Sequence, residues 1–196
     1  MTILAHEDDE TLGCGGILNR YNDQPIQCLI PIKRIEEQCR SAFKTLGIPN
    51  AVYGGFDDNQ LDKYPLLEIA KFVTSAIDRF NPDVVITHNN RCMNQDHRVL
   101  YEASCIATRP LKNHITLLTC EIPSSTGYLR PTGFEPTFYV ELSPDNIVKK
   151  MKAVEDYVTE FRKCRSPEVI SALARVRGAE SGYDYAEAIQ LIRCYE

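Results

Sequence analysis

Thr2-Ile3-Leu4-Ala5 is a short apolar run that leads directly into His6-Glu7-Asp8-Asp9-Glu10, which holds one imidazole and four carboxylates. Residues 10–22 follow as a predicted helix that begins in this polar cluster. A strand that ends in polar residues at the start of a helix is typical of open α/β sheets, which bind ligands at the carboxyl ends of their strands. The stretch therefore predicts both the fold class and the position of a functional site.

Short apolar segments alternate with helical patterns along the rest of the chain. We expect further strands at 27–32, 50–56, 83–88, 115–122 and 137–142, and helices at 34–46, 65–80, 95–108, 144–163, 167–176 and 184–193. This alternation indicates a mostly parallel sheet with helices on both faces. The chain shows no internal repeat or linker, so we expect one Rossmann-like α/β domain over residues 1–196.

The composition excludes several classes of protein. The 196 residues are 43% hydrophobic and 25% charged, as in ordinary globular domains. The net charge is −5 without a basic stripe, which argues against binding to nucleic acid. No apolar run approaches the roughly 20 residues of a membrane helix, and no secretory signal is visible. We therefore expect a cytoplasmic protein that does not insert into membranes.

The eight cysteines are irregularly spaced and form no C-x-x-C pair. This spacing excludes a zinc finger or ribbon. An even number of cysteines is compatible with disulfides, but a chain of this length without an export signal favours free thiols in a reducing compartment.

The first polar cluster has the composition of a metal site. Adjacent carboxylates repel one another unless a cation lies between them, and imidazole with carboxylate suits zinc or a similar divalent ion. His6 and Asp9, three residues apart, can reach one ion, which leaves Asp8 free as a base. The alternative is a helix N-terminus decorated with acids, which the helix dipole favours. That alternative does not explain His6.

A second cluster, Asn94-Gln95-Asp96-His97, follows the predicted buried strand 83–88. His97 would complete a set of three protein ligands with His6 and Asp9, and three ligands plus an open position are typical of catalytic zinc. Asp96 could orient one of the ligands. The alternative is that Asp96 caps a helix and that His97 is an ordinary surface residue. We interpret His88 as a hydrogen-bonded histidine at a strand end.

The glycines in Gly13-Cys14-Gly15-Gly16 fit the dinucleotide pattern G-x-G-x-x-G poorly. We interpret them as residues that let the first helix pack tightly on the sheet.

At the two clusters the chain resembles the LmbE/PIG-L family of metal-dependent N-deacetylases, whose signatures are A-H-P-D-D-E and a later H-x-D-H. In this chain, residues 5–10 correspond to the first signature and residues 94–97 to the second. Arg34-Ile35-Glu36-Glu37, Phe56-Asp57-Asp58-Asn59 and Tyr185-Ala186-Glu187 also resemble family segments. The resemblance therefore covers nearly the whole chain.

The resemblance implies a zinc-dependent hydrolase, with another divalent first-row metal as an alternative. Its ligands would be His6, Asp9 and His97. Asp8 would act as the general base that takes a proton from metal-bound water.

The resemblance also implies the substrate class, a small N-acetylglucosamine-type sugar or sugar conjugate. Arg34 and Asp58 would hold its hydroxyl groups. Known relatives often self-associate, so a homo-oligomer is an option for this chain.

Two residues depart from the family pattern. Glu7 replaces the usual proline, and Asn94 replaces the first histidine of H-x-D-H, which stabilises the oxyanion in relatives. Asparagine donates a hydrogen bond but carries no positive charge. We expect Asn94 to remain an oxyanion donor. Two alternatives stay open: a non-catalytic metal- or sugar-binding module of the same fold, and a metallohydrolase that acts on another amide or an ester.

Overall fold

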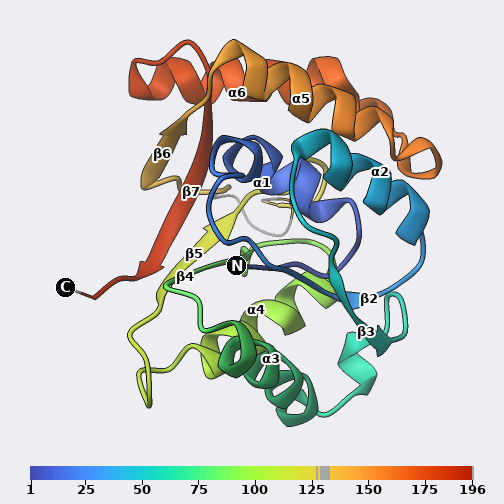
Figure 1. Ribbon diagram of the computed structural model, residues 1–196, viewed down its shortest axis with the longest axis vertical. Helices are drawn as coiled ribbons and strands as arrows, with labels where there is room; N and C mark the ends of the chain where they lie inside the picture. The colour runs from blue at the N-terminus through green and yellow to red at the C-terminus, as the bar shows by residue number, and fades with distance from the viewer. Residues whose placement is uncertain (127, 129–132, 196) are drawn as a thin grey trace.

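The computed structural model describes residues 1–126, 128 and 133–195. These residues form a seven-stranded sheet with the order β3-β2-β1-β4-β5-β7-β6 (Figure 1). The strands are β1 (Thr2–Ile3), β2 (Cys28–Ile32), β3 (Val52–Phe56), β4 (Val84–His88), β5 (Thr116–Cys120), β6 (Phe138–Glu141) and β7 (Ala186–Arg193). The first five strands in this order run parallel, whereas β7 is antiparallel to both of its neighbours. The predicted mostly parallel α/β fold is thereby confirmed.

Helices cover both faces of the sheet, as predicted. On one face lie α1 (Asp9–Arg20), α2 (Glu36–Leu46), α5 (Pro144–Glu155) and α6 (Pro167–Ser181), and on the other lie α3 (Leu66–Phe80) and α4 (Gln95–Ala107) (Figure 1). Short 3-10 helices span Leu61–Lys63 (η1), Val158–Glu160 (η2) and Lys163–Arg165 (η3).

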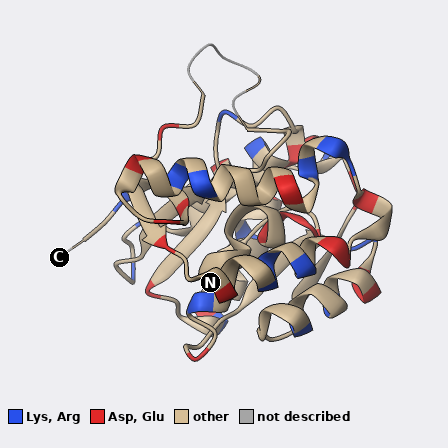
Figure 2. Cartoon of the chain, turned by 90° about the horizontal axis from the view of Figure 1, so that it is seen from above, with Lys and Arg blue, Asp and Glu red and all other residues tan. Residues whose placement is uncertain are grey.

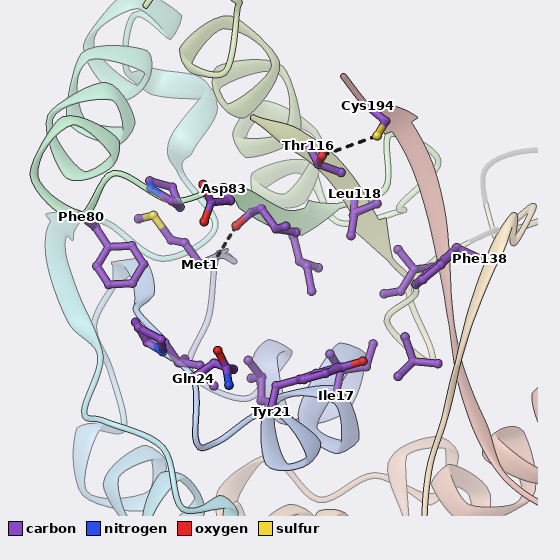
Figure 3. A pocket seen from close by; sticks show the side chains of 18 of the residues that line it. Met1, Ile17, Tyr21, Gln24, Phe80, Asp83, Thr116, Leu118, Phe138 and Cys194 are labelled. Carbon is purple, nitrogen blue, oxygen red and sulfur yellow. Dashed lines mark hydrogen bonds between the residues drawn. The ribbon is translucent and has the colours of Figure 1, made fainter. Parts of the chain in front are cut away.

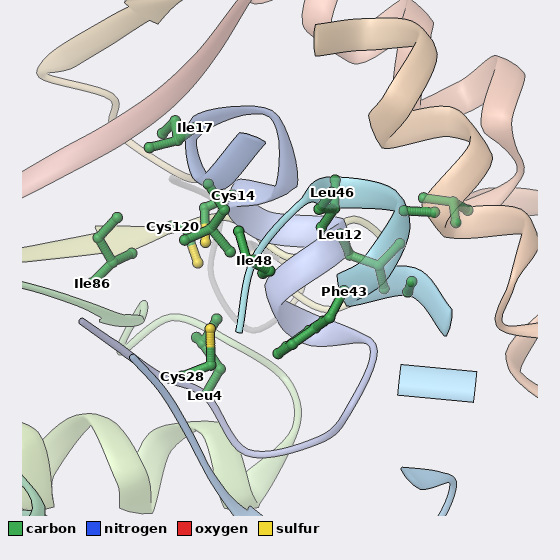
Figure 4. Close-up of a cluster of buried hydrophobic side chains, with 14 of the residues drawn as sticks. Leu4, Leu12, Cys14, Ile17, Cys28, Phe43, Leu46, Ile48, Ile86 and Cys120 are labelled. Carbon is green, nitrogen blue, oxygen red and sulfur yellow. The ribbon is translucent and has the colours of Figure 1, made fainter. Parts of the chain in front are cut away.

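The sheet separates two hydrophobic cores because consecutive residues of a strand point to opposite faces. Leu4 belongs to the core under α1, α2 and α5, where Phe43 and Leu46 are also fully buried (Figure 4). Ile3 belongs to the core under α3 and α4, together with Leu100. The short first strand is therefore fixed from both sides.

Helix α1 lies unusually close to the sheet. A Cβ atom on Gly13 would come within 2.7 Å of the Cys120 Sγ in β5, so a larger residue there would force neighbouring side chains to move. The helix is kinked at Cys14, whose φ of −148° is not helical. The interpretation of the glycine-rich segment as a packing feature is confirmed.

A buried ion pair stabilises this kink. The backbone N–H groups of Gly16 and Ile17 donate to the two carboxylate oxygens of Glu187 at 2.8 and 2.7 Å. The Lys150 ammonium donates to Glu187 at 2.6 Å and to the Leu12 carbonyl at 2.8 Å. Glu187 thus caps the second half of α1, and Lys150 neutralises the buried carboxylate.

Two predicted helices differ from the structure. The segment 184–193 is strand β7, although alanine, glutamate, glutamine and leucine favour helices. Pairing with β5 on one side and β6 on the other, together with the buried Glu187 contacts, outweighs that propensity. The predicted helix 144–163 ends at Glu155, and η2 and η3 follow it.

An apolar cavity of about 750 Å³ opens at the amino ends of the central parallel strands (Figure 3). Met1, Val84 and Thr116, which lie at the starts of β1, β4 and β5, border it together with Tyr21 and Phe138. The cavity therefore lies at the amino ends of the strands, whereas the polar clusters lie at their carboxyl ends.

Acidic and basic residues are interspersed along the helices in view in Figure 2. None of the helices in the described residues is both long enough and apolar enough to cross a membrane. All eight cysteines are free thiols, and Cys164 and Cys194 are the two exposed ones.

We expect Glu187→Gln to lower the free energy of unfolding by about 3 kcal/mol or more, because it leaves the Lys150 ammonium buried without a counter-charge. Chemical denaturation measures the change. Asp145→Asn is the control, since Asp145 forms an exposed pair with Lys149 at 2.9 Å and should cost less than about 1 kcal/mol. Equal losses in the two variants would contradict the assigned role of Glu187.

Candidate metal centre

The two polar clusters meet at the carboxyl ends of β1 and β4, which are adjacent parallel strands in the middle of the sheet. The chain leaves β1 towards β2 on one side, while β4 continues the sheet on the other side. Such a reversal of strand order is where open α/β sheets bind ligands. His6 follows β1, Asp9 begins α1, and His97 lies in the first turn of α4.

Three side-chain atoms of these residues form a compact triangle. The His6 Nδ1 lies 3.2 Å from the Asp9 Oδ2 and 3.1 Å from the His97 Nε2, and the last two atoms are 3.2 Å apart. All three residues are buried. Sequence positions 91 residues apart are thus brought to one point.

The triangle fits a tetrahedral divalent ion. Bond lengths of about 2.0–2.1 Å to nitrogen and oxygen place the ligands of tetrahedral zinc about 3.3 Å apart. Two imidazole nitrogens and one carboxylate oxygen form a donor set that suits zinc and similar first-row ions. The residues therefore fit the ion that the sequence analysis predicts.

His6 is oriented through its second ring nitrogen. The Nε2 lies 3.2 Å from the Asp96 Oδ2 and 3.3 Å from the Asp58 Oδ1. Asp96 is fully buried and also accepts hydrogen bonds from the backbone N–H groups of Asn59 and Leu61. A carboxylate on the far side of a ligating imidazole fixes its tautomer. An ion held in the triangle would therefore face Nδ1, whereas Nε2 faces Asp58 and Asp96, which with His6 form a second group that could hold a metal.

His97 is oriented by a thiol. Its Nδ1 lies 3.0 Å from the Sγ of Cys92, which is fully buried in the loop after β4. Burial alone would raise the pKa of Cys92, but the hydrogen bonds with His97 and Thr126 hold this pKa below its usual value. Cys92 thus has the place that a carboxylate or carbonyl commonly takes behind a metal ligand.

His88 supports the site without belonging to the triangle. Its Nε2 accepts a hydrogen bond from the Ala5 backbone N–H at 2.8 Å, and its ring stacks on His97 with 3.7 Å between the centroids. Burial, followed by the charge of His97, holds the pKa of His88 well below its usual value. The interpretation of His88 as a hydrogen-bonded residue at a strand end is confirmed.

The electrostatics of the triangle favour a cation. Burial alone would lower the pKa values of His6 and His97. Hydrogen bonds with Asp58, Asp9 and Asp96 instead raise the pKa of His6 well above its usual value, and Asp9 raises the pKa of His97 to about 9. Burial alone would raise the pKa of Asp9, but His97 and His88 hold it well below its usual value. A divalent ion would satisfy the same demand for positive charge.

The two acids beside Asp9 behave differently. Burial, followed by the charge of Asp9, raises the pKa of Asp8 to about 6, although the Arg165 guanidinium opposes this rise. The Arg165 Nη1 donates to the Asp8 Oδ2 at 2.6 Å. Burial raises the pKa of Glu10 well above its usual value, and its carboxyl oxygens have no partner among the described residues. Burial without a hydrogen-bond partner thus favours the uncharged form of the Glu10 carboxyl group.

The predicted substrate residues lie together beside the site. The Arg34 Nη1 donates to the Asp58 Oδ2 at 3.3 Å, and both side chains are partly exposed. Glu7 accepts hydrogen bonds from the backbone N–H groups of Arg34 and Ile35 at 2.8 and 2.7 Å. Glu7, which stands where the family signature has proline, thus fixes the backbone of Arg34 and Ile35 just before α2 begins.

Asn94 is the N-cap of α4, where its side-chain oxygen accepts from the backbone N–H of Asp96 at 2.8 Å. The amide nitrogen of Asn94 makes no hydrogen bond within the described residues and remains available as a donor. The capping role weighed for Asp96 thus falls to Asn94, and oxyanion stabilisation by Asn94 stays a prediction.

Sequence reasoning missed Cys92 and Arg165. Cys92 lies five residues before His97, and its position in the loop after β4 was its only signal. Arg165 lies 157 residues after Asp8, and no motif marks it.

Comparison with known proteins relates the chain to a family of deacetylases. The model of the PIG-L family, described as GlcNAc-PI de-N-acetylase, matches residues 27–108. The curated protein "Uncharacterized deacetylase YaiS" of Escherichia coli K12 is 25% identical over 154 residues, which are 69% of this chain and 80% of YaiS. The resemblance to the PIG-L deacetylases is confirmed.

Solved structures show how widely this fold is shared. The conserved protein TT1542 of Thermus thermophilus superposes with a TM-score of 0.78 at 23% identity, over 100% of this chain and 94% of TT1542. The N,N'-diacetylchitobiose deacetylase of Pyrococcus horikoshii gives 0.75 at 15% identity, over 97% and 82%. GalB, the 4-carboxy-2-hydroxymuconate hydratase of Pseudomonas putida KT2440, gives 0.73 at 17% identity, over 100% and 97%. At these identities the likeness establishes the fold and no more.

We expect the protein to bind one equivalent of divalent metal, measured by mass spectrometry of the metal after dialysis. His97→Gln should remove most of the metal, because it deletes one of three buried ligands. His114→Gln is the matched control, since His114 stacks on Tyr195 and is not part of the triangle. Full metal content in His97→Gln would contradict the assigned ligand set.

We expect Cys92→Ala to weaken metal affinity by about 10-fold to 100-fold, since loss of the group behind a ligating histidine commonly has this effect. Competition with a chelating dye measures the dissociation constant. Cys164→Ala, at an exposed cysteine, should leave the constant unchanged. A dissociation constant in Cys92→Ala equal to that of the wild type would show that the thiol does not orient His97.

Proposed function

We propose that this protein is a zinc-dependent hydrolase that removes the N-acetyl group from a glucosamine-type sugar or sugar conjugate. The observation that carries the proposal is the triangle of His6, Asp9 and His97, with the carboxyl group of Asp8 next to it in the chain. The family match and the curated relative support a hydrolytic N-deacetylase. The sugar substrate named for the Pyrococcus horikoshii enzyme motivates the choice of an N-acetylated sugar.

His6, Asp9 and His97 would hold the ion, which when bound supplies a Lewis acid that polarises the amide carbonyl and activates water. Asp8 would accept a proton during attack on the carbonyl and return it to the departing amine. The free amide N–H of Asn94 would donate to the oxyanion. Arg34 and Asp58 would hold hydroxyl groups of the sugar through their remaining donors and acceptors.

We keep the cytoplasm as the proposed location, because eight free thiols suit a reducing compartment. We keep zinc as the proposed ion, because the donor set of two imidazoles and one carboxylate matches catalytic zinc sites. A homo-oligomer stays a prediction.

We expect zinc-loaded protein to release acetate from at least one member of a panel of N-acetylglucosamine conjugates, measured by a coupled acetate assay. Asp8→Asn should lower kcat by about 100-fold to 10,000-fold, because the base is lost. Asp78→Asn, at an exposed carboxylate paired with Lys112, is the matched control and should keep full activity.

The outcomes of this experiment separate the alternatives. Release of another acyl group or cleavage of an ester, with the same dependence on Asp8, would indicate a different metallohydrolase. Stoichiometric metal with saturable sugar binding but no turnover would indicate a binding module. The likeness to GalB makes hydration of an unsaturated carboxylate a further reaction to assay. Acetate release that is unchanged in Asp8→Asn would overturn the proposed base.

A further inference from the structure

Arg165 reaches the candidate site from a distant part of the chain. It is the last residue of η3 and lies two residues before α6 (Pro167–Ser181) begins. Its Nη1 donates to the Asp8 Oδ2 at 2.6 Å, and its side chain is only 21% exposed. Arg165 is neither a proposed metal ligand nor a predicted sugar-binding residue, so neither of these roles explains its contact with Asp8.

The guanidinium is also held from a second side. The Arg165 Nε donates to the Ser124 Oγ at 2.8 Å. Ser124 has a φ of +77°, a left-handed conformation that non-glycine residues rarely adopt and that persists where surrounding contacts enforce it. The backbone carbonyl of the next residue, Ser125, accepts a hydrogen bond from the Met93 backbone N–H at 2.8 Å. The loop after β5, the loop after β4 and η3 thus together fix the position of Arg165.

Asp8 needs such a cation. Asp8 and Asp9 are consecutive and both buried, so their negative charges disfavour each other. Asp9 faces the imidazoles of His6, His88 and His97. The charged partner of Asp8 in the described residues is Arg165. Arginine stays protonated in proteins, so it can hold a carboxylate without exchanging a proton with it.

The hydrogen bond from Arg165 makes the two carboxylate oxygens of Asp8 different from each other. Within the described residues, Oδ2 is the only oxygen of Asp8 that accepts a side-chain hydrogen bond. Oδ1 is left for other partners, and it is not among the fully enclosed unpartnered atoms. A base that moves a proton twice in one turnover needs one such oxygen in a fixed place, and preorganisation of this kind commonly requires support from outside the reacting groups.

We propose that Arg165 is a positioning residue for Asp8: it holds the Oδ2 so that the Oδ1 accepts and returns the proton of the hydrolytic reaction. This inference rests on the proposed function. It assigns to η3 and to the strained Ser124 a part in catalysis, although neither carries a metal ligand. Arg165 donates to Asp8 and to Ser124 at the same time. The inference therefore predicts that the reaction rate depends both on the positive charge at position 165 and on the planar arrangement of the guanidinium N–H groups.

The test compares Arg165→Met and Arg165→Lys with wild type in the metal-loaded protein. Arg165→Met should lower kcat by about 10-fold to 100-fold with little change in KM, because the base is misplaced while the sugar contacts remain. Arg165→Lys should lie between the two, and added guanidinium ion should partly restore Arg165→Met. Arg162→Met is the matched control, because Arg162 donates only to backbone carbonyls of its own segment among the described residues.

A double-variant cycle shows whether Arg165 acts through Asp8. If it does, Asp8→Asn with Arg165→Met should be no slower than Asp8→Asn alone. A further loss in the double variant, a rise in KM without a fall in kcat, or unchanged kinetics in Arg165→Met would each overturn the proposal. Metal content should stay at the wild-type level in all variants, and its loss in Arg165→Met would indicate a structural role.

The same cycle measured by chemical denaturation does not depend on turnover. Arg165→Met should shift the unfolding midpoint in the wild-type background and shift it less in the Asp8→Asn background. If wild type hydrolyses no conjugate, the proposed function fails, and this coupling still tests whether Arg165 holds Asp8. Equal shifts in both backgrounds would overturn the contact itself.

Discussion

The structure depends on one electrostatic constraint: the negative charges that enter the protein interior after β1 must be compensated there. His6 to Thr11 are six consecutive polar residues that are nearly or completely buried. Burial of an uncompensated charge costs several kcal/mol or more. Asp9 is compensated by the imidazoles, Asp8 by Arg165, and Glu7 by two backbone N–H groups at the start of α2. The compensating groups come from the segment before α2 and from α4, η3 and β4, so distant segments of the chain converge on this one loop.

This arrangement connects stability with function. The buried triangle brings a carboxylate and two imidazoles within 3.2 Å of one another, which demands positive charge at that point. The groups behind the ligands, Asp96 and Cys92, are themselves buried and hydrogen-bonded, so the ring orientations are set by the folded core. The site is therefore preorganised, and its rim, which carries Arg34 and Asp58, is the part that solvent reaches. The apolar cavity lies at the opposite ends of the strands and shares no lining residue with the triangle.

The sequence was most informative where one residue pattern had one physical explanation. An apolar run ending in a polar cluster predicted the end of β1, and Asp83-Val84-Val85-Ile86-Thr87-His88 predicted β4, so the meeting of the two clusters followed from the parallel sheet. The prediction of a helix at 184–193 was wrong, because local helix propensity carries no information about two neighbouring strands or about the buried partners of Glu187. The contact of Arg165 with Asp8 was equally invisible, since it spans 157 residues and depends on how η3 packs against the loop after β5. The thiol behind His97 could be found only once the loop after β4 was placed.

X-ray absorption spectroscopy of the zinc-loaded protein tests the central claim most directly, because it measures the distances from the ion to its ligands. Two imidazole nitrogens and one carboxylate oxygen predict a first shell of nitrogen and oxygen at about 2.0–2.1 Å, with the outer-shell scattering of two imidazole rings. A zinc–sulfur distance of about 2.3 Å would contradict the account, because it would make Cys92 a ligand in place of a group that orients His97. A shell of oxygen alone would contradict it as well, because it would place the ion among carboxylates outside the triangle.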